Sequence, residues 1–144
     1  MLNKFFQSFN EPKNANENTF QADLYNIVYE VIIADHEISP KEIDLSSELV
    51  EYYFQIPKDV NKQEFLKLAD KQHFNTDLSR FTQRLKLSLS YEQRMDIILI
   101  CWQVLMVDGI EDQLEISTVR TLSTLLGLED KDFILIRNRV KDSL

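Results

Sequence analysis

The chain has 144 residues, of which 24 are acidic and 16 are basic, so its formal net charge is −8 at pH 7. This length predicts a single domain that can bury a substantial core. Only 2 glycines and 3 prolines are present, which argues against a β-sandwich or barrel because hairpin turns need residues with special backbone angles. The acidic balance argues against general nucleic-acid binding, since few cations are available to neutralise phosphates.

Residues 1–19 are predicted to form a short amphipathic helix and a polar linker, ahead of one helical domain over residues 20–144. Apolar side chains within residues 2–9 recur on one side of a helix. Docking of this helix on the protein's own core is favoured over contact with a membrane, because Lys4 alone attracts anionic lipid weakly. Residues 10–19 are rich in asparagine, which indicates a flexible connection.

From residue 20 onwards, apolar residues recur at spacings of three and four, and no segment shows sustained alternation with a period of two. The sequence therefore predicts an all-α fold, a compact bundle of about seven to eight helices. Together with the first helix, this periodicity predicts helices over residues 20–35, 40–54, 61–69, 77–85, 91–107, 113–126 and 133–140.

Several helix boundaries carry local signals. Ser39 and Ser90 are each followed three residues later by Glu or Gln, which is the capping-box pattern. Asp112 is predicted to cap a helix, and Asn61 offers a further helix start. Gly127 is predicted to end a helix in the left-handed conformation.

The segment 97–107 is apolar on nearly every side. This pattern predicts a helix surrounded by other helices, at the centre of the core. Gly109 follows it and suits the left-handed position that closes a helix. The segment is much shorter than the roughly 20 residues needed to span a bilayer. No secretory signal is visible at the N-terminus, and the single cysteine cannot form an internal disulfide, so we expect a cytoplasmic protein.

The chain contains an internal repeat. An offset of 73 residues superposes residues 27–54 on residues 100–127. Each copy has an apolar helix, an Asp at its end, a short turn, a cap and a Glu seven residues after the Asp. We expect the two helix pairs to pack on each other about a pseudo-twofold axis, with the two acidic turns at comparable positions.

The acidic residues of the two turns have two interpretations. Side-chain oxygens at helix N-termini satisfy backbone N–H groups, at a gain of about 1 kcal/mol each. Asp35 and Asp108 follow helix C-termini instead, where a carboxylate costs about 0.3–1 kcal/mol. They require a compensating partner, which is either the N-terminus of the next helix or a cation.

A hard divalent cation is the second interpretation. All-oxygen donors suit Ca²⁺, Mg²⁺ or Mn²⁺, although no cofactor is certain. The turns are not EF-hand loops, because the invariant glycine within that loop is missing. His36 offers a nitrogen ligand, but a solvated turn histidine is the simpler interpretation. The candidate metal ligands are Asp35, Glu37 and Glu42 in the first turn and Asp108, Glu111, Asp112 and Glu115 in the second.

Catalytic signatures are missing from the sequence. It contains no Gly-rich phosphate loop, no nucleophile elbow, no zinc-protease motif and no paired cysteines. Cys101 and Trp102 lie in the most apolar helix, where a buried thiol and a core aromatic ring are the simplest interpretations. His73 has the features of a surface histidine. We therefore expect no enzyme activity.

The segments ADHEISPKE (34–42) and VDGIEDQLE (107–115), with LLGL at 125–128, resemble the paired ADG-then-E segments of the TerB family of tellurite-resistance proteins. The TerB domain is similar to one in DjlA-type membrane co-chaperones. The resemblance covers most of residues 20–140. It implies an all-helical fold with two related halves and a bacterial cytoplasmic setting. It also implies a role in metal-linked stress response through ion or protein binding.

By position, the family's acidic residues fall on Asp35, Glu37, Glu42, Asp108 and Glu115. The chain departs from the pattern at His36, where the family usually has glycine, and at Ile110, where the first copy has Glu37. Two functions follow as hypotheses. The first is binding of a divalent cation or a protein partner through the acidic turns. The second is a purely structural interaction module, in which the turns are helix caps and the first helix recruits a protein partner.

Overall fold

We analysed the protein as a computed structural model, which describes residues 10–34, 37–71, 78–107 and 111–143. Within these ranges all regular secondary structure is helical, which confirms the predicted all-α fold. The helices are α2 (Asn10–Ile32), α3 (Pro40–Phe54), α4 (Lys58–Asp70), α5 (Leu78–Ser88), α6 (Tyr91–Leu105), α7 (Gln113–Leu125) and α8 (Asp130–Asp142).

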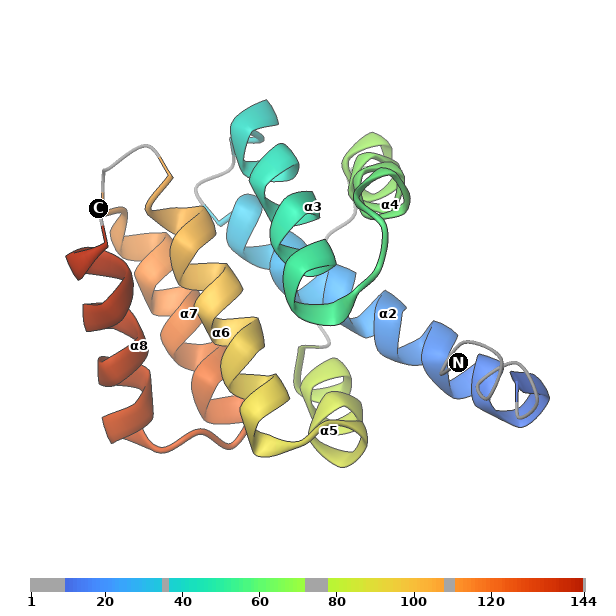
Figure 1. Cartoon of the computed structure of the whole chain (residues 1–144). Coiled ribbons are helices and arrows are strands. Elements are labelled where there is room, and N and C mark those ends of the chain that lie inside the picture. The colour runs from blue at the N-terminus through green and yellow to red at the C-terminus, as the bar shows by residue number, and fades with distance from the viewer. Residues whose placement is uncertain (1–9, 35–36, 72–77, 108–110, 144) are drawn as a thin grey trace.

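Two helices form the centre of the bundle. Helix α6 contacts α2, α3, α5, α7 and α8, which confirms the central place predicted for the segment 97–107. Helix α2 contacts α3, α4, α5, α6 and α7, and its N-terminal half extends beyond the other helices (Figure 1). Helix α6 ends at Leu105, slightly earlier than predicted, and Gly109 lies outside the described residues.

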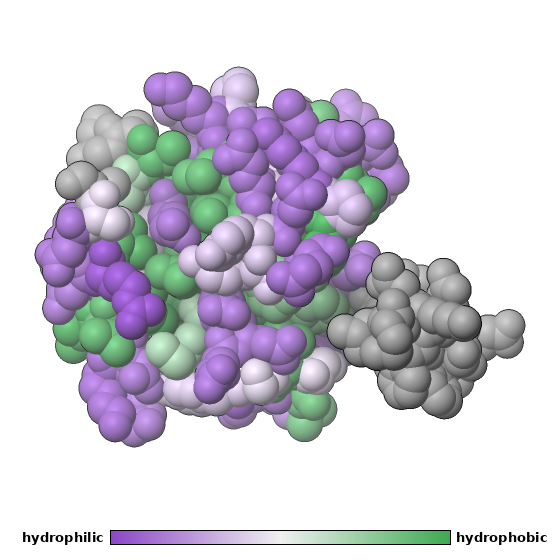
Figure 2. All heavy atoms as spheres, viewed as in Figure 1, coloured by the Kyte–Doolittle hydropathy of each residue, from purple (hydrophilic) through white to green (hydrophobic). Residues whose placement is uncertain are grey.

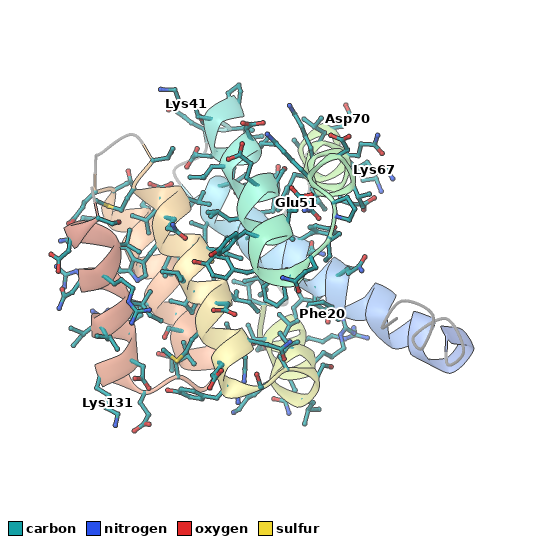
Figure 3. The ribbon with its side chains drawn as sticks, in the orientation of Figure 1. Phe20, Lys41, Glu51, Lys67, Asp70 and Lys131 are labelled. Atoms are coloured by element: carbon teal, nitrogen blue, oxygen red, sulfur yellow. The ribbon has the colours of Figure 1, made fainter. Side chains whose placement is uncertain are left out.

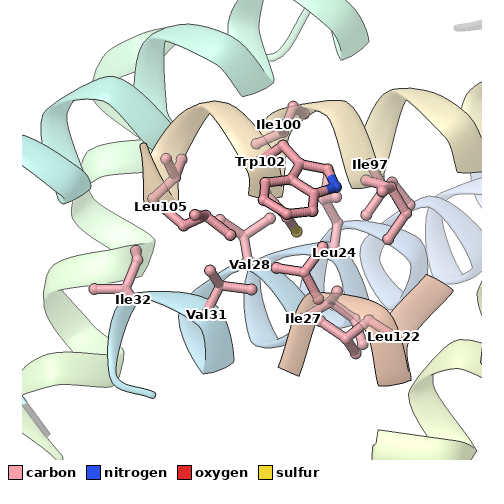
Figure 4. Close-up of a cluster of buried hydrophobic side chains, with 14 of the residues drawn as sticks. Leu24, Ile27, Val28, Val31, Ile32, Ile97, Ile100, Trp102, Leu105 and Leu122 are labelled. Atoms are coloured by element: carbon pink, nitrogen blue, oxygen red, sulfur yellow. The ribbon is translucent and has the colours of Figure 1, made fainter. Parts of the chain in front are cut away.

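The core is one continuous hydrophobic cluster. Figure 4 shows buried hydrophobic side chains of α2, α6 and α7 in this cluster, Trp102 among them. The surface is more mixed: in Figure 2 hydrophilic residues dominate over α3 and α4, whereas hydrophobic residues show between α3 and α8. The fully buried residues labelled in Figure 4 include Leu24, Ile27, Val28, Val31, Ile32, Ile97, Ile100 and Leu122.

Residues 10–19 differ from the prediction. They form the first turns of α2, where a flexible linker was expected. Pro12 is the third residue of this helix, a position whose N–H group has no partner within the helix, so proline is tolerated there. Asparagine in a helix costs only a fraction of a kcal/mol, about 0.7 at most. The division of the chain at residue 20 stays a prediction, and residues 2–9 lie outside the described part.

Phe20 is where α2 reaches the body of the protein. Its ring centroid lies 5.5 Å from that of Phe54 at the end of α3, and Figure 3 shows it beside the lower end of α3. The pair joins α2 to α3 through an aromatic contact.

The capping-box signal was correct at one of its two positions. The predicted capping box at Ser90 is confirmed, because its Oγ accepts from the Gln93 N–H while the Gln93 side chain accepts from the Ser90 N–H. Ser39 occupies the cap position of α3, but its side chain makes no capping hydrogen bond. Helix α8 begins at Asp130, three residues earlier than predicted.

Asn61 was predicted to start a helix, and this was wrong. Helix α4 begins at Lys58, after Pro57, and Asn61 is a fully buried residue within it. Its side chain bonds to groups outside α4, which local sequence cannot indicate. The next helix, predicted from residue 77, begins at Leu78 among the described residues, and residues 72–77 lie outside them.

The turns of the two repeat copies have matching boundaries. Helix α2 ends at Ile32 and α3 begins at Pro40. Helices α6 and α7 end and begin 73 residues further along the chain, at Leu105 and Gln113. The two turns therefore match in length and in the helix ends that flank them, and the repeat as a whole stays a prediction. The pseudo-twofold packing of the two pairs stays a prediction.

Gly127 adopts the left-handed conformation predicted for it, with φ of 79°. A Cβ atom there would lie 2.9 Å from Lys86 Cε and 3.2 Å from Arg94 Nη1. We expect Gly127→Ala to lower the free energy of unfolding by about 1–2 kcal/mol, because an L side chain is strained at this backbone angle. Chemical denaturation measures this loss.

Gln55 provides the matched control, since its φ is 59° in a comparable position after α3. Gln55→Gly relieves the same kind of strain, so it should leave stability unchanged or raise it by up to about 1 kcal/mol. Equal stability of Gly127→Ala and the parent protein would contradict the argument.

Candidate functional site

The candidate site consists of the two acidic turns, one between α2 and α3 and the other between α6 and α7. Asp35, His36 and Asp108 lie outside the described residues. Glu37 is exposed, whereas Glu42 and Glu115 are buried, with 7% and 4% of their surface accessible. The described carboxylates of the turns therefore range from exposed, at Glu37, through half-buried, at Asp112, to buried.

Glu42 and Glu115 occupy equivalent positions. Each is the third residue of its helix, α3 or α7, and the repeat offset superposes them. A buried carboxylate is costly unless hydrogen bonds or opposite charge compensate it. The first turn of a helix supplies free N–H groups and the positive end of the helix dipole. Both glutamates are thus placed where the fold favours a negative charge near its interior.

Asp112 acts as the predicted helix cap. Its Oδ1 accepts hydrogen bonds from the backbone N–H groups of Leu114, at 2.9 Å, and Glu115, at 3.2 Å. The equivalent residue in the first turn, Ser39, makes no such bond through its side chain. The predicted cap is confirmed at Asp112, and the two turns are chemically unequal.

Glu111 is held by α8. Its carboxylate forms an ion pair with the Lys141 ammonium group. The hydrogen bond from Lys141, followed by the charges of Lys141 and Arg137, lowers the pKa of Glu111, although partial desolvation opposes the shift. Glu111 therefore has a protein partner, and a cation would have to compete with Lys141 for it.

Among the described residues, no three His, Cys, Asp or Glu side chains are close enough together to hold a metal ion. The described donors of each turn do not complete a cation site by themselves. A site at the first turn would draw on residues 35–36, and one at the second turn on residues 108–110, all of which lie outside the described part. The oxygen donors themselves suit Ca²⁺, Mg²⁺ or Mn²⁺.

Cys101 is buried, as predicted. Burial raises its pKa to about 12, so it remains a protonated thiol near neutral pH and is a poor nucleophile. Trp102 is likewise a core residue, with its ring centroid 5.6 Å from that of Phe133. His73 lies outside the described residues.

A family model of tellurite resistance protein TerB matches residues 21–138. The chain belongs to the TerB family. The match includes both acidic turns and all seven candidate ligands, and it confirms the resemblance seen in the sequence. Comparison with curated proteins and with solved structures gives no significant match. The helices of this TerB chain within the described ranges include none that is long and apolar enough to cross a membrane.

Sequence reasoning missed one feature of this TerB domain. Arg120 of α7 and Arg137 of α8 line a common pocket next to the second turn. The helical spacing of Gln113, Ile116 and Arg120 was visible in the sequence, as was that of Phe133 and Arg137. That spacing places each set on one helix face, but it does not show that the two faces meet.

Proposed function

We propose that this TerB chain is a non-enzymatic cytoplasmic domain that binds a divalent cation at its acidic turns, in a bacterial tellurite or metal stress response. The observation that carries the proposal is the burial of Glu42 and Glu115 at equivalent helix starts. Two carboxylates kept near the interior at the same place in both repeats are suited to anchor a hard cation.

The remaining ligands follow from the positions of the turns. Asp35 and Asp108 come three residues after the ends of α2 and α6, where the helix dipole disfavours a negative charge. A bound cation would neutralise that repulsion. In the first turn Glu37 is exposed and can join the site. In the second turn Asp112 remains the helix cap and Glu111 the partner of Lys141.

A purely structural module that recruits a protein partner is the second candidate. The cap formed by Asp112 and the ion pair between Glu111 and Lys141 favour it, because they give two of the seven acids a role without any ligand. In this case the turns stabilise helix starts, and no cation affects stability specifically.

Thermal unfolding with Ca²⁺, Mg²⁺ or Mn²⁺ separates the two functions. An ion at 100 times its dissociation constant should stabilise the protein by about 2.7 kcal/mol. We expect this gain to be lost in the Glu42→Gln/Glu115→Gln and Asp35→Asn/Asp108→Asn double variants. Glu51→Gln is the control: Glu51 is exposed on α3, away from the helix start marked by Lys41 (Figure 3), and its variant should keep the full gain.

The absence of a shift with all three ions would reject cation binding and favour the structural module. An equal shift in the parent protein and in both double variants would lead to the same conclusion. The variants' unfolding curves without ions show whether the substitutions alone change the fold.

A further inference from the structure

A pocket of about 160 Å³ is lined by residues of α6, α7, α8 and the second turn. Helix α7 contributes three residues spaced i, i+3 and i+7, which share one helix face, and α8 contributes two residues one turn apart. The lining residues are Trp102, Glu111, Gln113, Ile116, Arg120, Phe133 and Arg137.

The pocket is cationic although the whole chain is acidic. In the described part of the chain, neither Arg120 nor Arg137 has a carboxylate within ion-pair distance. The Arg120 guanidinium carbon lies 4.6 Å from the centroid of the Phe133 ring, so a cation–π contact holds it at the pocket wall. Glu111, the carboxylate on this wall, is already paired with Lys141. Two guanidinium groups thus border the pocket, and the charge of its carboxylate, Glu111, is balanced by Lys141.

Trp102 adds an independent observation. It is 1% exposed and forms part of the pocket wall, and its Nε1–H group has no hydrogen-bond acceptor among the described residues. Buried N–H groups are rarely left without an acceptor. An oxyanion in the pocket would bring acceptor oxygens to this wall and negative charge to the two arginines.

We propose that this pocket binds a small oxyanion, of the size of phosphate, sulfate or tellurite, between Arg120 and Arg137. The planar guanidinium forks match pairs of anionic oxygens. The volume is well below the roughly 300–1,000 Å³ of pockets for drug-sized ligands, so the pocket has the size for a small ion. The site is distinct from the proposed cation site, since it uses neither Glu42 nor Glu115.

The fluorescence of Trp102 tests the proposal, because it is the single tryptophan of the chain. The full chain is titrated with sodium phosphate, sulfate or tellurite, and with sodium chloride at matched ionic strength. We expect a saturable change with at least one oxyanion and none with chloride. Arg120→Gln and Arg137→Gln should each weaken binding about tenfold or more, because each removes a charge-assisted pair of hydrogen bonds.

Arg139→Gln is the control. Arg139 is exposed on α8 and does not line the pocket. Its substitution removes the same charge as the pocket substitutions, so the variant should bind the oxyanion with the affinity of the parent protein. Calorimetric titration gives a second readout if a substitution alters the tryptophan signal, and thermal unfolding verifies that each variant is folded.

Three results would overturn the proposal. They are no saturable response to any of the three oxyanions by either readout, unchanged affinity in both pocket variants, or an equal loss in Arg139→Gln. The last of these would assign the effect to general electrostatic attraction.

Discussion

Replacing Asn61 with alanine is expected to lower the free energy of unfolding by about 3–5 kcal/mol, because it removes three buried hydrogen bonds between different parts of the fold. The Asn61 Oδ1 accepts from the Tyr25 hydroxyl at 2.6 Å. Its Nδ2 donates to the carbonyl oxygens of Ser47, at 3.0 Å, and Ile56, at 2.8 Å. One side chain thus joins α2, α3 and the segment before α4.

The Tyr25 end of this network is insensitive to physiological pH. Burial, and then the charge of Glu64, raise the pKa of Tyr25 to about 12. The hydroxyl therefore stays protonated and remains a donor. Tyr25→Phe removes one of the three bonds and leaves the Asn61 oxygen without its donor, so it should cost about 1–2 kcal/mol.

Denaturant unfolding of Asn61→Ala measures the main effect, and Asn138→Ala is its matched control. Asn138 is exposed in α8, where alanine has the better helix propensity, so this variant should be neutral or more stable by up to about 0.7 kcal/mol. A loss in Asn61→Ala no larger than that in Tyr25→Phe would show that the network contributes less than its geometry indicates.

The second large effect is expected at the ion pair between Asp23 and Arg84. Arg84 Nε and Nη2 donate to the two carboxylate oxygens of Asp23 at 2.9 and 2.8 Å, which joins α2 to α5. The Asp23 side chain is 2% exposed and that of Arg84 36%. We expect Arg84→Met to cost about 2–4 kcal/mol, because it leaves a buried carboxylate without its guanidinium.

The double variant Asp23→Leu/Arg84→Met distinguishes loss of the pair from loss of the arginine itself. It removes both charges, so it should be more stable than Arg84→Met. Lys67→Met is the control. Lys67 forms an ion pair with Glu64 in which both side chains are exposed, and such surface pairs contribute about 0–1 kcal/mol to stability. A double variant as unstable as Arg84→Met, measured by denaturant unfolding, would attribute the loss to packing of the arginine chain.

Local sequence was sufficient for several features that depend on residues close together in the chain. Apolar periodicity predicted the helices, and the spacing of Ser90 and Gln93 predicted a cap that the structure confirms. The positive φ of Gly127 followed from its place after a helix. The even apolar distribution over residues 97–107 predicted the central helix, since only a surrounded helix can bury every side.

Residues 10–19 show where local reasoning failed. Their composition is typical of a loop. They are nevertheless helical and form the N-terminal part of α2, ahead of its apolar part from residue 20 onwards. Helix propensities differ by less than about 1 kcal/mol per residue among residues other than proline, so an adjoining packed helix can extend through a weakly favourable segment.

The sequence by itself determined an all-α TerB domain with two acidic turns, because these features depend on periodicity and on motifs a few residues long. Only the tertiary structure decided that Asn61 bonds across helices and that Asp23 meets Arg84. It also decided that Arg120 and Arg137 share one pocket. These partners lie on different helices, and which helix faces meet depends on the packing of the whole core, which no short segment specifies.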